Sequence, residues 1–353
     1  MTTISCCMIV KNEEKVLARC LDSIKDLMDE IIIVDTGSTD NTKAIAHNYT
    51  DKIYDFAWND NFSDARNFSF QKATMDYIYV PDADEYLDEE NRHQFALLKE
   101  YINPQIEIVQ MMYHTINHDT VLNIRKEYRP KLFRRLRTFT WIDPIHETVR
   151  LNPLVFNSEI IITHAPLCDH SKRDFSIYQK VIKQNTLLSD NVISMYATEL
   201  IKMGTKEDLL LAKEYFQQIF ECSDNEELRV KAACVLVRCA RLTEDFDAMM
   251  KLLPEYPLAD TTSEICYDFG VFYFSRKEYQ KAIDWLRTAI NDAPYALDVH
   301  TCGDTAIQTL LNCYQELINI TTDTEDLAIY NSEFSVYTQM LANWESPIET
   351  VEY

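Results

Sequence analysis

The stretch EIIIVDTGSTD, residues 30–40, joins a short apolar run to a polar turn. The run consists of β-branched residues, which favour strands, and Asp35 stands where such a strand would end. Gly37 can adopt a positive φ, and the Ser-Thr-Asp that follows it supplies residue types that cap helices. The stretch therefore predicts a buried strand, a sharp turn and a helix over residues 41–48.

The same alternation of strand and helix extends on both sides of this stretch. Short β-forming runs occupy residues 4–10, 52–58 and 77–80, and helical spacing of apolar residues marks 15–28 and 63–74. Apolar strands separated by helices are typical of a parallel sheet that is covered on both faces. Ligands of such sheets bind at the carboxyl ends of the strands, so we expect the two polar turns at one edge.

The turn at residues 35–40 lacks the glycine spacing of dinucleotide-binding folds and the lysine of phosphate-binding loops. An Asp at the last position of a strand can accept a hydrogen bond from a base or from a ribose hydroxyl. The turn is therefore either part of a nucleoside site or a plain capped connection.

The second turn, in YIYVPDADEYLD at residues 77–88, is strongly acidic. Asp82 and Asp84 are one residue apart and can face the same way from an extended turn. Their hard oxygen atoms suit Mg²⁺ or Mn²⁺, which take substrate phosphates as further ligands. A solvated loop is the alternative, because a lone Asp-x-Asp is a weak signal. Glu85 could face an acceptor, and Asp88 and Glu89 are expected to be solvated at a helix start.

Residues 106–165 are rich in β formers and predict an antiparallel extension of the sheet. Basic residues gather there, against the acidic balance of the chain: Arg125, Lys126, Arg129, Lys131, Arg134, Arg135 and Arg137. They indicate either a solvated sheet edge that discourages strand pairing or a patch that binds phosphate or guides an acidic acceptor.

Three further motifs carry candidate site residues. WNDNFSDARNFSF, residues 58–70, places Arg66 on an expected helix, where it could pair with phosphate, Asp35 or Asp82. WIDPIHETV, residues 141–149, offers Asp143 and Glu147 as a general base, or else a structural His–Glu pair. IITHAPLCDH, residues 161–170, ends an apolar strand with His164, which is either a ligand of the same metal or a structural histidine.

From about Asp174 the pattern is helical to the end of the chain. Residues 265–294 carry tetratricopeptide spacing, with Gly270 and Tyr273 on a first helix, a second helix with Ala282, Leu286 and Ala289, and Pro294 after it. Weaker copies place Ala212 and Ala248 in the position of Ala282, and a helical pair over 303–341 would close the array. Such repeats stack into a superhelix with a concave side. An unrelated helical bundle is the alternative.

These patterns divide the chain into four segments: residues 1–170, an α/β domain; 171–195, a connecting helix; 196–345, an all-α repeat domain; and 346–353, a tail. The formal net charge of −23 over 353 residues disfavours nucleic acid and anionic membranes as partners. Ten cysteines without a CxxC pair favour buried free thiols, and no apolar run approaches the roughly 20 residues of a membrane span. The start of the chain does not have the pattern of a signal peptide, so we expect a cytoplasmic protein.

Together, CMIVKNEE, IIIVDTGSTDNT, WNDNFSDARN, YIYVPDADE, RPKLFRR…IHE and ITHA, in this order, resemble family 2 glycosyltransferases with a GT-A (Rossmann-like nucleotide-diphospho-sugar transferase) fold. With tetratricopeptide-like helices behind it, the chain is similar to the bacterial peptide S-glycosyltransferases of the glycocin type. The resemblance implies metal-dependent, inverting transfer from a UDP-sugar to a peptide or protein. A cell-surface glycan or polysaccharide is the alternative acceptor. A catalytically inactive binding module is the alternative class, and a nucleotidyltransferase is disfavoured because CMIVKNEE lacks a glycine-rich basic loop.

The resemblance also implies roles for individual residues. Asp35 and the backbone of Ile9, Val10 and Lys11 would hold the base, and Glu13, Arg66 and Ala83 would complete the nucleotide pocket. Asp82 would contact the ribose or the metal, Asp84 would be the principal Mg²⁺ or Mn²⁺ ligand, and His164 would complete that site. Glu147 would act as base, with Asp143 as the second candidate, although Pro144 replaces the glycine that the family often has. The repeats would engage the acceptor and could form a homodimer.

Overall fold

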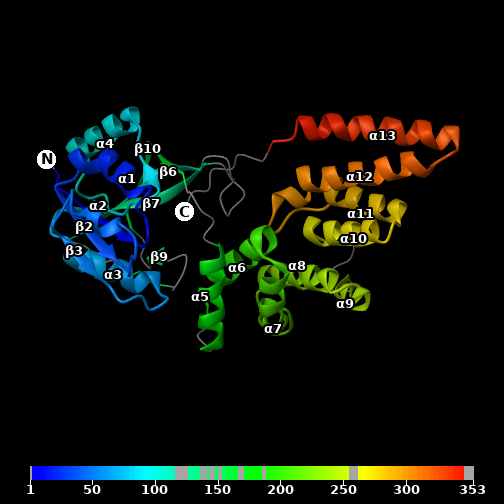
Figure 1. The fold of residues 1–353 in the computed structure, drawn as a ribbon, viewed down its shortest axis with the longest axis horizontal. Coiled ribbons are helices and arrows are strands. Elements are labelled where there is room, and N and C mark those ends of the chain that lie inside the picture. The colour runs from blue at the N-terminus through cyan, green and yellow to red at the C-terminus, as the bar shows by residue number, and fades with distance from the viewer. Residues whose placement is uncertain are drawn as a thin grey trace. The chain divides into compact units, whose positions relative to one another are not determined.

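The computed structural model describes residues 2–115, 126–135, 141–142, 148–149, 153–165, 171–184, 188–253 and 261–345. The chain divides into two compact units, with the boundary between Val181 and Ile182. The N-terminal unit is built on a β-sheet and the C-terminal unit consists of helices (Figure 1). Each unit is described by itself.

An eight-stranded sheet forms the centre of the N-terminal unit, in the order β3-β2-β1-β4-β7-β6-β10-β5. Its strands are β1 (Ile4–Val10), β2 (Glu30–Asp35), β3 (Ile53–Asp55), β4 (Tyr77–Tyr79), β5 (Glu85–Tyr86), β6 (Ile108–Thr115), β7 (Lys126–Arg134) and β10 (Val155–His164). The strands β8 (Trp141–Ile142) and β9 (Thr148–Val149) pair separately. The first four strands run parallel, which confirms the predicted alternation.

The second half of the sheet is mixed: the predicted antiparallel extension is confirmed for β7 and was wrong for β10. Strand β7 is antiparallel to both β4 and β6, but β10 is parallel to β6. Strand β10 starts at the end of the sheet where β7 stops, so it runs opposite to β7 and therefore parallel to β6. Because β7 lies inside the sheet, the solvated-edge interpretation of its basic residues Arg129 and Lys131 was also wrong.

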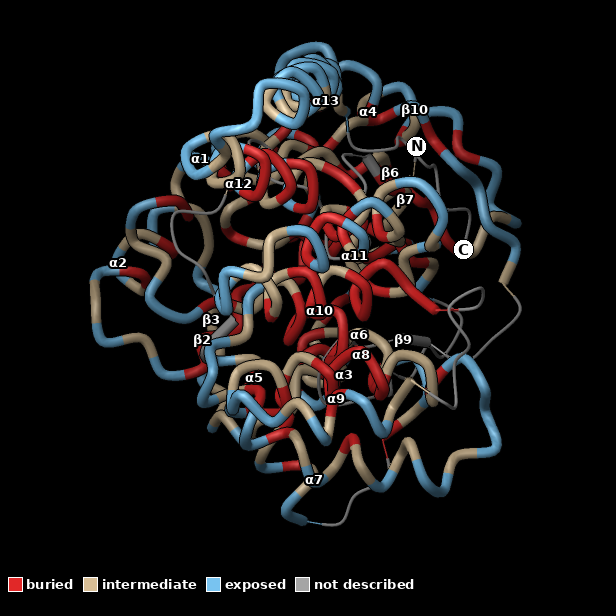
Figure 2. Tube along the Cα trace, turned by 90° about the vertical axis from the view of Figure 1, so that its right-hand side faces the viewer, coloured by how far each residue is buried: buried red, intermediate tan, exposed pale blue. Residues whose placement is uncertain are grey.

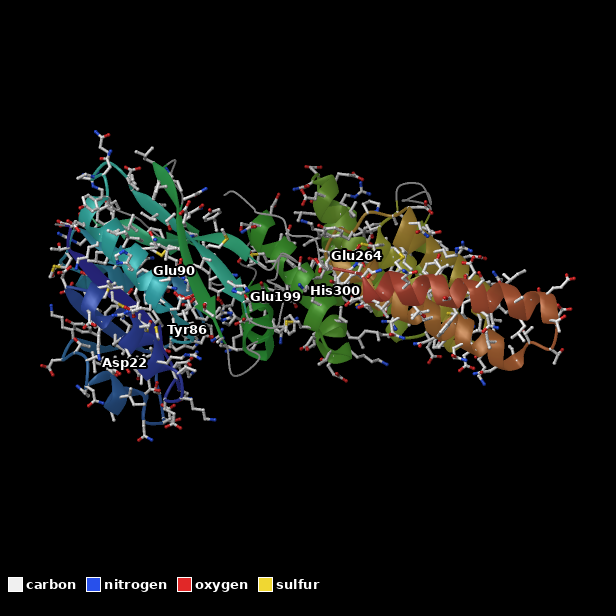
Figure 3. All side chains as sticks on the ribbon, turned by 90° about the horizontal axis from the view of Figure 1, so that it is seen from above. Asp22, Tyr86, Glu90, Glu199, Glu264 and His300 are labelled. Atoms are coloured by element: carbon white, nitrogen blue, oxygen red, sulfur yellow. The ribbon has the colours of Figure 1, made fainter. Side chains whose placement is uncertain are left out.

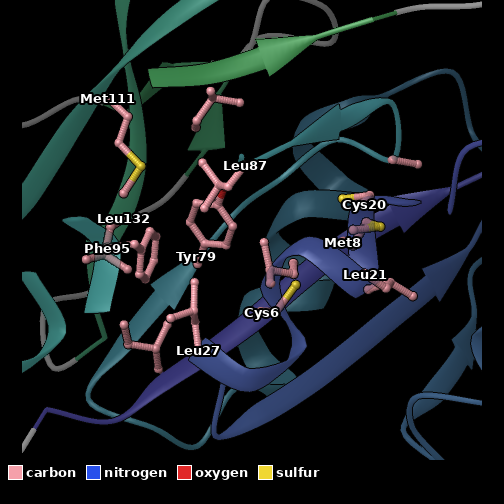
Figure 4. Packing of buried hydrophobic residues seen from close by; sticks show 14 of the residues in the cluster. Cys6, Met8, Cys20, Leu21, Leu27, Tyr79, Leu87, Phe95, Met111 and Leu132 are labelled. Atoms are coloured by element: carbon pink, nitrogen blue, oxygen red, sulfur yellow. The ribbon is translucent and has the colours of Figure 1, made fainter. Parts of the chain in front are cut away.

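Helices cover both faces of the sheet, as a parallel sheet requires. They are α1 (Leu17–Ile24), the 3-10 turn η1 (Lys25–Leu27), α2 (Thr42–Ala46), α3 (Phe62–Lys72) and α4 (Glu89–Tyr101). Helix α5 (Ser171–Lys183) instead contacts the segment before α3, where Lys180 Nζ lies 2.9 Å from Asp60 Oδ2. Alternate residues of β1 face opposite ways: Cys6 and Met8 pack with Leu21 of α1 and Phe95 of α4, whereas Cys7 faces the cluster that α3 covers. Figure 4 shows the first of these clusters around Tyr79 and Phe95.

The C-terminal unit is a series of helices that pack in consecutive pairs (Figure 1). They are α6 (Asp190–Met203), α7 (Lys206–Cys222), α8 (Glu226–Leu242), α9 (Phe246–Leu252), α10 (Ser263–Ser275), α11 (Tyr279–Asn291), the 3-10 turn η3 (Val299–Thr301), α12 (Asp304–Ile320) and α13 (Thr324–Ala342). Buried residues run along α8 and α10, which contact each other as well as their own partners (Figure 2). This stacking is that of a helical repeat array.

The tetratricopeptide positions lie where the spacing predicts them. A Cβ atom on Gly270 of α10 would lie 2.6 Å from Leu286 Cγ of α11, so only glycine permits this approach. Ala282, Leu286 and Ala289 are fully buried. Beyond α11, the buried carboxylate of Glu264 (labelled in Figure 3) accepts hydrogen bonds from the backbone N of Ala296, Leu297 and Asp298, at 3.0, 2.6 and 2.8 Å. It thereby fixes the connection to the next pair of helices.

Two expectations from composition can be compared with the described residues. Among them, no helix combines the length and the apolar character needed to cross a membrane. The cysteines in the same part of the chain are all free thiols, and all are buried except Cys222, which is exposed, and Cys302, which is half-buried.

Candidate active site

Two loops at the carboxyl ends of β1 and β2 are hydrogen-bonded to each other. Asn12, which tolerates its positive φ of 58°, accepts a hydrogen bond from Thr39 N at 2.8 Å and donates its own N–H to Ser38 Oγ at 2.9 Å. The backbone N of Glu13 donates to Thr42 Oγ1 at 2.7 Å. These hydrogen bonds therefore hold the first polar turn and the loop that follows β1 together as one ordered unit.

Asp35 ends β2 and is 1% exposed. One of its carboxylate oxygens accepts hydrogen bonds from Gly37 N at 3.2 Å and Ser38 N at 3.1 Å, and Lys43 Nζ lies 3.7 Å from it. Gly37, with a φ of 102°, makes this tight turn possible. The Asp35 carboxylate is thus held by its own turn, and its two oxygen atoms can still accept a hydrogen bond from a further donor.

The predicted base-binding backbone lies beside Asp35. Ile9 and Val10 are the last residues of β1, and Val10 pairs with Asp35 in the sheet. The carbonyl of Val10 accepts hydrogen bonds from Thr36 N at 3.0 Å and Thr36 Oγ1 at 3.2 Å. Lys11 follows at the exposed start of the loop.

The acidic turn follows β4, and its first carboxylate faces two cations. Arg66 Nη2 of α3 lies 3.8 Å from Asp82 Oδ1, and Lys131 Nζ of β7 lies 3.5 Å from Asp82 Oδ2. Burial acts to raise the pKa of Asp82, but Lys131 and Arg66 outweigh it and hold that pKa well below its usual range. Asp82 therefore stays ionised, and the predicted pairing of Arg66 with Asp82 is the one that the structure shows.

Glu85 points into the protein, and the expectation that it could face an acceptor was wrong. It is 1% exposed, and Lys131 Nζ donates to its carboxylate at 2.6 Å. The same carboxylate accepts a hydrogen bond from Asp82 N at 3.2 Å. Burial raises the pKa of Glu85 to about 7, although Lys131 acts to lower it. Glu85 is thus an internal support of the turn.

Asp84 and His164 meet across the sheet edge. His164 Nε2 of β10 lies 3.1 Å from Asp84 Oδ2, and the backbone N of Ala165 donates to the Asp84 carbonyl at 3.2 Å. The His164 ring packs against Tyr113 of β6 in a tilted arrangement, with the ring centroids 5.0 Å apart. The buried Nδ1 of His164 has no hydrogen-bond partner among the described residues.

Arg19 of α1 connects the acidic turn with the end of β10. Its Nη2 donates to the carbonyls of Asp84 and Ala165, at 3.1 and 3.3 Å, and its guanidinium lies 4.8 Å from the ring centroid of Tyr86 (labelled in Figure 3). No sequence pattern indicates this role, because the contacts go to backbone atoms 65 and 146 residues away.

Glu13 adds a third carboxylate to the same edge. Burial, together with the negative charges of Asp84, Asp40 and Asp82, raises the pKa of Glu13 to about 7, although Arg173 acts to lower it. Lys131 and Arg66 offset the charges of Asp82 and Glu85. The raised pKa of Glu13 reflects the surplus of carboxylates at this edge, which a bound cation would offset.

The donor atoms at this edge fit Mg²⁺ or Mn²⁺. Asp84 and His164 are in contact and Asp82 belongs to the same turn, and such ions use one or two carboxylates together with substrate phosphates. No three His, Cys, Asp or Glu side chains converge as a complete metal cage within the described ranges.

The predicted base candidates Glu147 and Asp143 lie outside the described residues. Asp88 is exposed at the start of α4, as expected, and its carboxylate caps this helix by accepting a hydrogen bond from Asn91 N at 2.9 Å. Lys131 was only one of seven basic residues within 125–137, and the signal that could have distinguished it is Pro130, a residue that marks bulges when it occurs in an inner strand.

Comparison with known proteins points to one family. Residues 5–155 match the family model described as glycosyl transferase family 2. A TPR repeat-containing protein of Synechococcus elongatus is 51% identical over 87 residues, which cover 25% of this chain and 22% of the relative. The SPbeta prophage-derived glycosyltransferase SunS of Bacillus subtilis is 42% identical over 96 residues, 27% of this chain and 23% of SunS.

A longer alignment joins the chain to an uncharacterized glycosyltransferase of Rickettsia felis, with 27% identity over 220 residues, 58% of this chain and 73% of the relative. The alignments with the Synechococcus protein and SunS span less than a quarter of those two proteins. The matched region contains the parallel half of the sheet, both polar turns and Lys131. Residues 5–155 are therefore a glycosyl transferase family 2 domain with a GT-A-like sheet.

Proposed function

We propose that this protein is a metal-dependent, inverting glycosyltransferase that moves a sugar from a UDP-sugar to a peptide or protein. The observation that carries the proposal is the meeting of Asp84 with His164, next to an ionised Asp82, at the carboxyl edge of a family 2 domain. The diphosphate of a nucleotide is negatively charged, and so are the carboxylates that the protein places at that edge. Binding therefore needs a cation between them.

Asp84 and His164 would hold Mg²⁺ or Mn²⁺, and Asp82 would contact the ion or the ribose. When bound, the ion supplies positive charge that stabilises the leaving diphosphate. Asp35 and the backbone of residues 9–11 would orient the base, with Ala83 beside the nucleotide. Arg66 and Lys131 keep Asp82 ionised in the absence of a donor.

Inverting transfer also needs a base that accepts the proton of the acceptor nucleophile. Glu147 is our candidate and Asp143 is the second. The nucleophile would attack the anomeric carbon from the side opposite to the diphosphate, so that the C–O bond to the diphosphate breaks as the new bond forms. The proton would then rest on the carboxylate of the base.

A peptide or protein acceptor is supported by the resemblance to SunS, and the helical repeats offer a surface for its recognition. A cell-surface glycan is the second candidate, and a homodimer through the repeats is a further proposal. The free thiols suit a reducing compartment, so we place the activity in the cytoplasm. A catalytically inactive binding module is the alternative from another class, and the ordered donor edge argues against it.

Thermal unfolding with UDP, with and without Mn²⁺, tests the donor site first. We expect UDP to raise Tm only when Mn²⁺ is present, and a screen of nucleotide sugars for hydrolysis would then name the sugar. Asp84→Ala should abolish both effects and leave folding intact. Glu89→Ala is the control, because its side chain is 96% exposed on the same segment. No response of the wild type to UDP with Mn²⁺, or full activity of Asp84→Ala, would refute the proposed function.

A further inference from the structure

Strand β7 contains a bulge directly beneath the acidic turn. Val109 of β6 pairs with Leu132 and the next residue, Gln110, pairs with Pro130, so Lys131 is the extra residue. Pro130 has no N–H and fits a bulge better than a regular inner strand. Bulges near active sites commonly redirect a side chain.

The bulge changes where the Lys131 side chain goes. In a regular strand, neighbouring residues face opposite sides of the sheet. Here Leu132 packs in the same cluster as Tyr113, and Lys131 Nζ also lies 5.5 Å from the Tyr113 ring centroid. Both residues thus face one side, and the ammonium reaches the segment after β4.

Lys131 connects three points of that segment. Its Nζ lies 2.6 Å from Glu85 Oε1, 3.5 Å from Asp82 Oδ2 and 3.5 Å from the Val80 carbonyl oxygen. The side chain is 6% exposed, so it does not itself present a surface to a substrate. In turn, Glu85 holds the backbone N of Asp82.

We propose that Lys131 is a positioning residue that sets the conformation of residues 80–85, so that Asp82 and Asp84 are in place before a donor binds. The inference rests on the proposed function, because it assigns Lys131 to the donor site of that reaction. Removing Lys131 would free the turn, and binding of UDP with Mn²⁺ would then have to order it again.

A purely structural ion pair is the competing explanation, and the chain contains a matched example. Lys99 of α4 is equally buried, lies 2.7 Å from Asp29 and donates to the Leu27 carbonyl at 2.8 Å, but contacts none of the site residues. Lys99→Met is therefore the control for the loss of a buried lysine from the same unit.

The experiment compares Lys131→Met, Lys131→Arg, Lys99→Met and the double variant Lys131→Met/Glu85→Gln. In the double variant no buried carboxylate lacks its partner, and the amide oxygen that Glu85→Gln introduces can still accept a hydrogen bond from Asp82 N. Measurements on the full chain are Tm, Kd for UDP with Mn²⁺, kcat and KM for hydrolysis of the UDP-sugar, and hydrogen exchange at the backbone amides of residues 82 and 85.

We expect the double variant to regain the Tm that Lys131→Met loses, yet to keep a kcat/KM reduced on the order of tenfold, mainly through KM. Hydrogen exchange at the amides of residues 82 and 85 should be faster in the double variant than in Lys99→Met. Lys131→Arg should recover part of the affinity for UDP with Mn²⁺. If the double variant regains wild-type kcat/KM within about twofold, Lys131 is structural only and the inference is wrong.

The failure of the proposed function would look different. If the wild type does not bind UDP with Mn²⁺, the exchange data still decide on Lys131. Faster exchange at residues 82 and 85 in the double variant supports its positioning role, and exchange equal to that of Lys99→Met refutes it. If Lys131→Met alone does not fold, the exchange measured in the double variant still tests the positioning role of Lys131.

Discussion

Glu13 offers the sharpest test of the electrostatics at the candidate site. Its carboxyl group is half-buried, and burial together with Asp84, Asp40 and Asp82 raises its pKa from 4.5 to about 7. Between these pH values the folded protein binds a proton that the unfolded chain has already released. The free energy of unfolding must therefore fall as the pH rises through this window, and the loss is complete above the folded pKa.

The size of the effect follows from the shift. One pKa unit corresponds to about 1.4 kcal/mol, so a rise from 4.5 to about 7 sets a ceiling of about 3 kcal/mol. Water screens a half-buried carboxyl group, which lowers our expectation to about 1–2 kcal/mol. Glu13→Gln removes the charge, so this variant should match the wild type near pH 4 and exceed its stability by that amount near pH 8.

Urea denaturation in EDTA between pH 4 and pH 8 measures the difference. Glu85, whose pKa is also raised to about 7, titrates in both proteins and cancels when they are compared. Glu89→Gln is the control and should show no pH-dependent change, because its carboxylate is 96% exposed. A stability difference between Glu13→Gln and the wild type that stays constant with pH would refute the reasoning.

Three further predictions concern packing and charge. Gly270→Ala should lower the free energy of unfolding by about 1–3 kcal/mol in denaturant titrations, since the new Cβ would lie 2.6 Å from Leu286 Cγ. Arg238→Met should cost about 2 kcal/mol in the same measurement, because Arg238 Nε lies 2.7 Å from the fully buried Asp268 carboxylate, which keeps Arg241 as a cationic partner; an unchanged stability would contradict this. Arg66→Met should raise the KM for the UDP-sugar on the order of tenfold, because Asp82 loses a cation; an unchanged KM would show that Lys131 suffices.

The repeat array and the strand–helix order were both accessible from the sequence because their signals are local. β-branched runs and capped turns predict the parallel half of the sheet, and small residues such as Gly270 and Ala282 mark helices that approach closely. The pairing of Arg66 with Asp82 was one of three options in the sequence, and only the packing of α3 selected it.

The sequence by itself determined where the proposed site residues stand: Asp35, Asp82, Asp84 and His164 lie at or just after the ends of strands, and strand ends are set by local composition. Only the tertiary structure decided how they are supported. The antiparallel pairing of β10 with β5, in which His164 stands opposite Glu85, brings His164 to Asp84, 80 residues earlier, and the bulge at Lys131 places its ammonium on Glu85, 46 residues earlier. Such contacts depend on strand register, which is fixed by the packing of the whole sheet and leaves no local pattern in the chain.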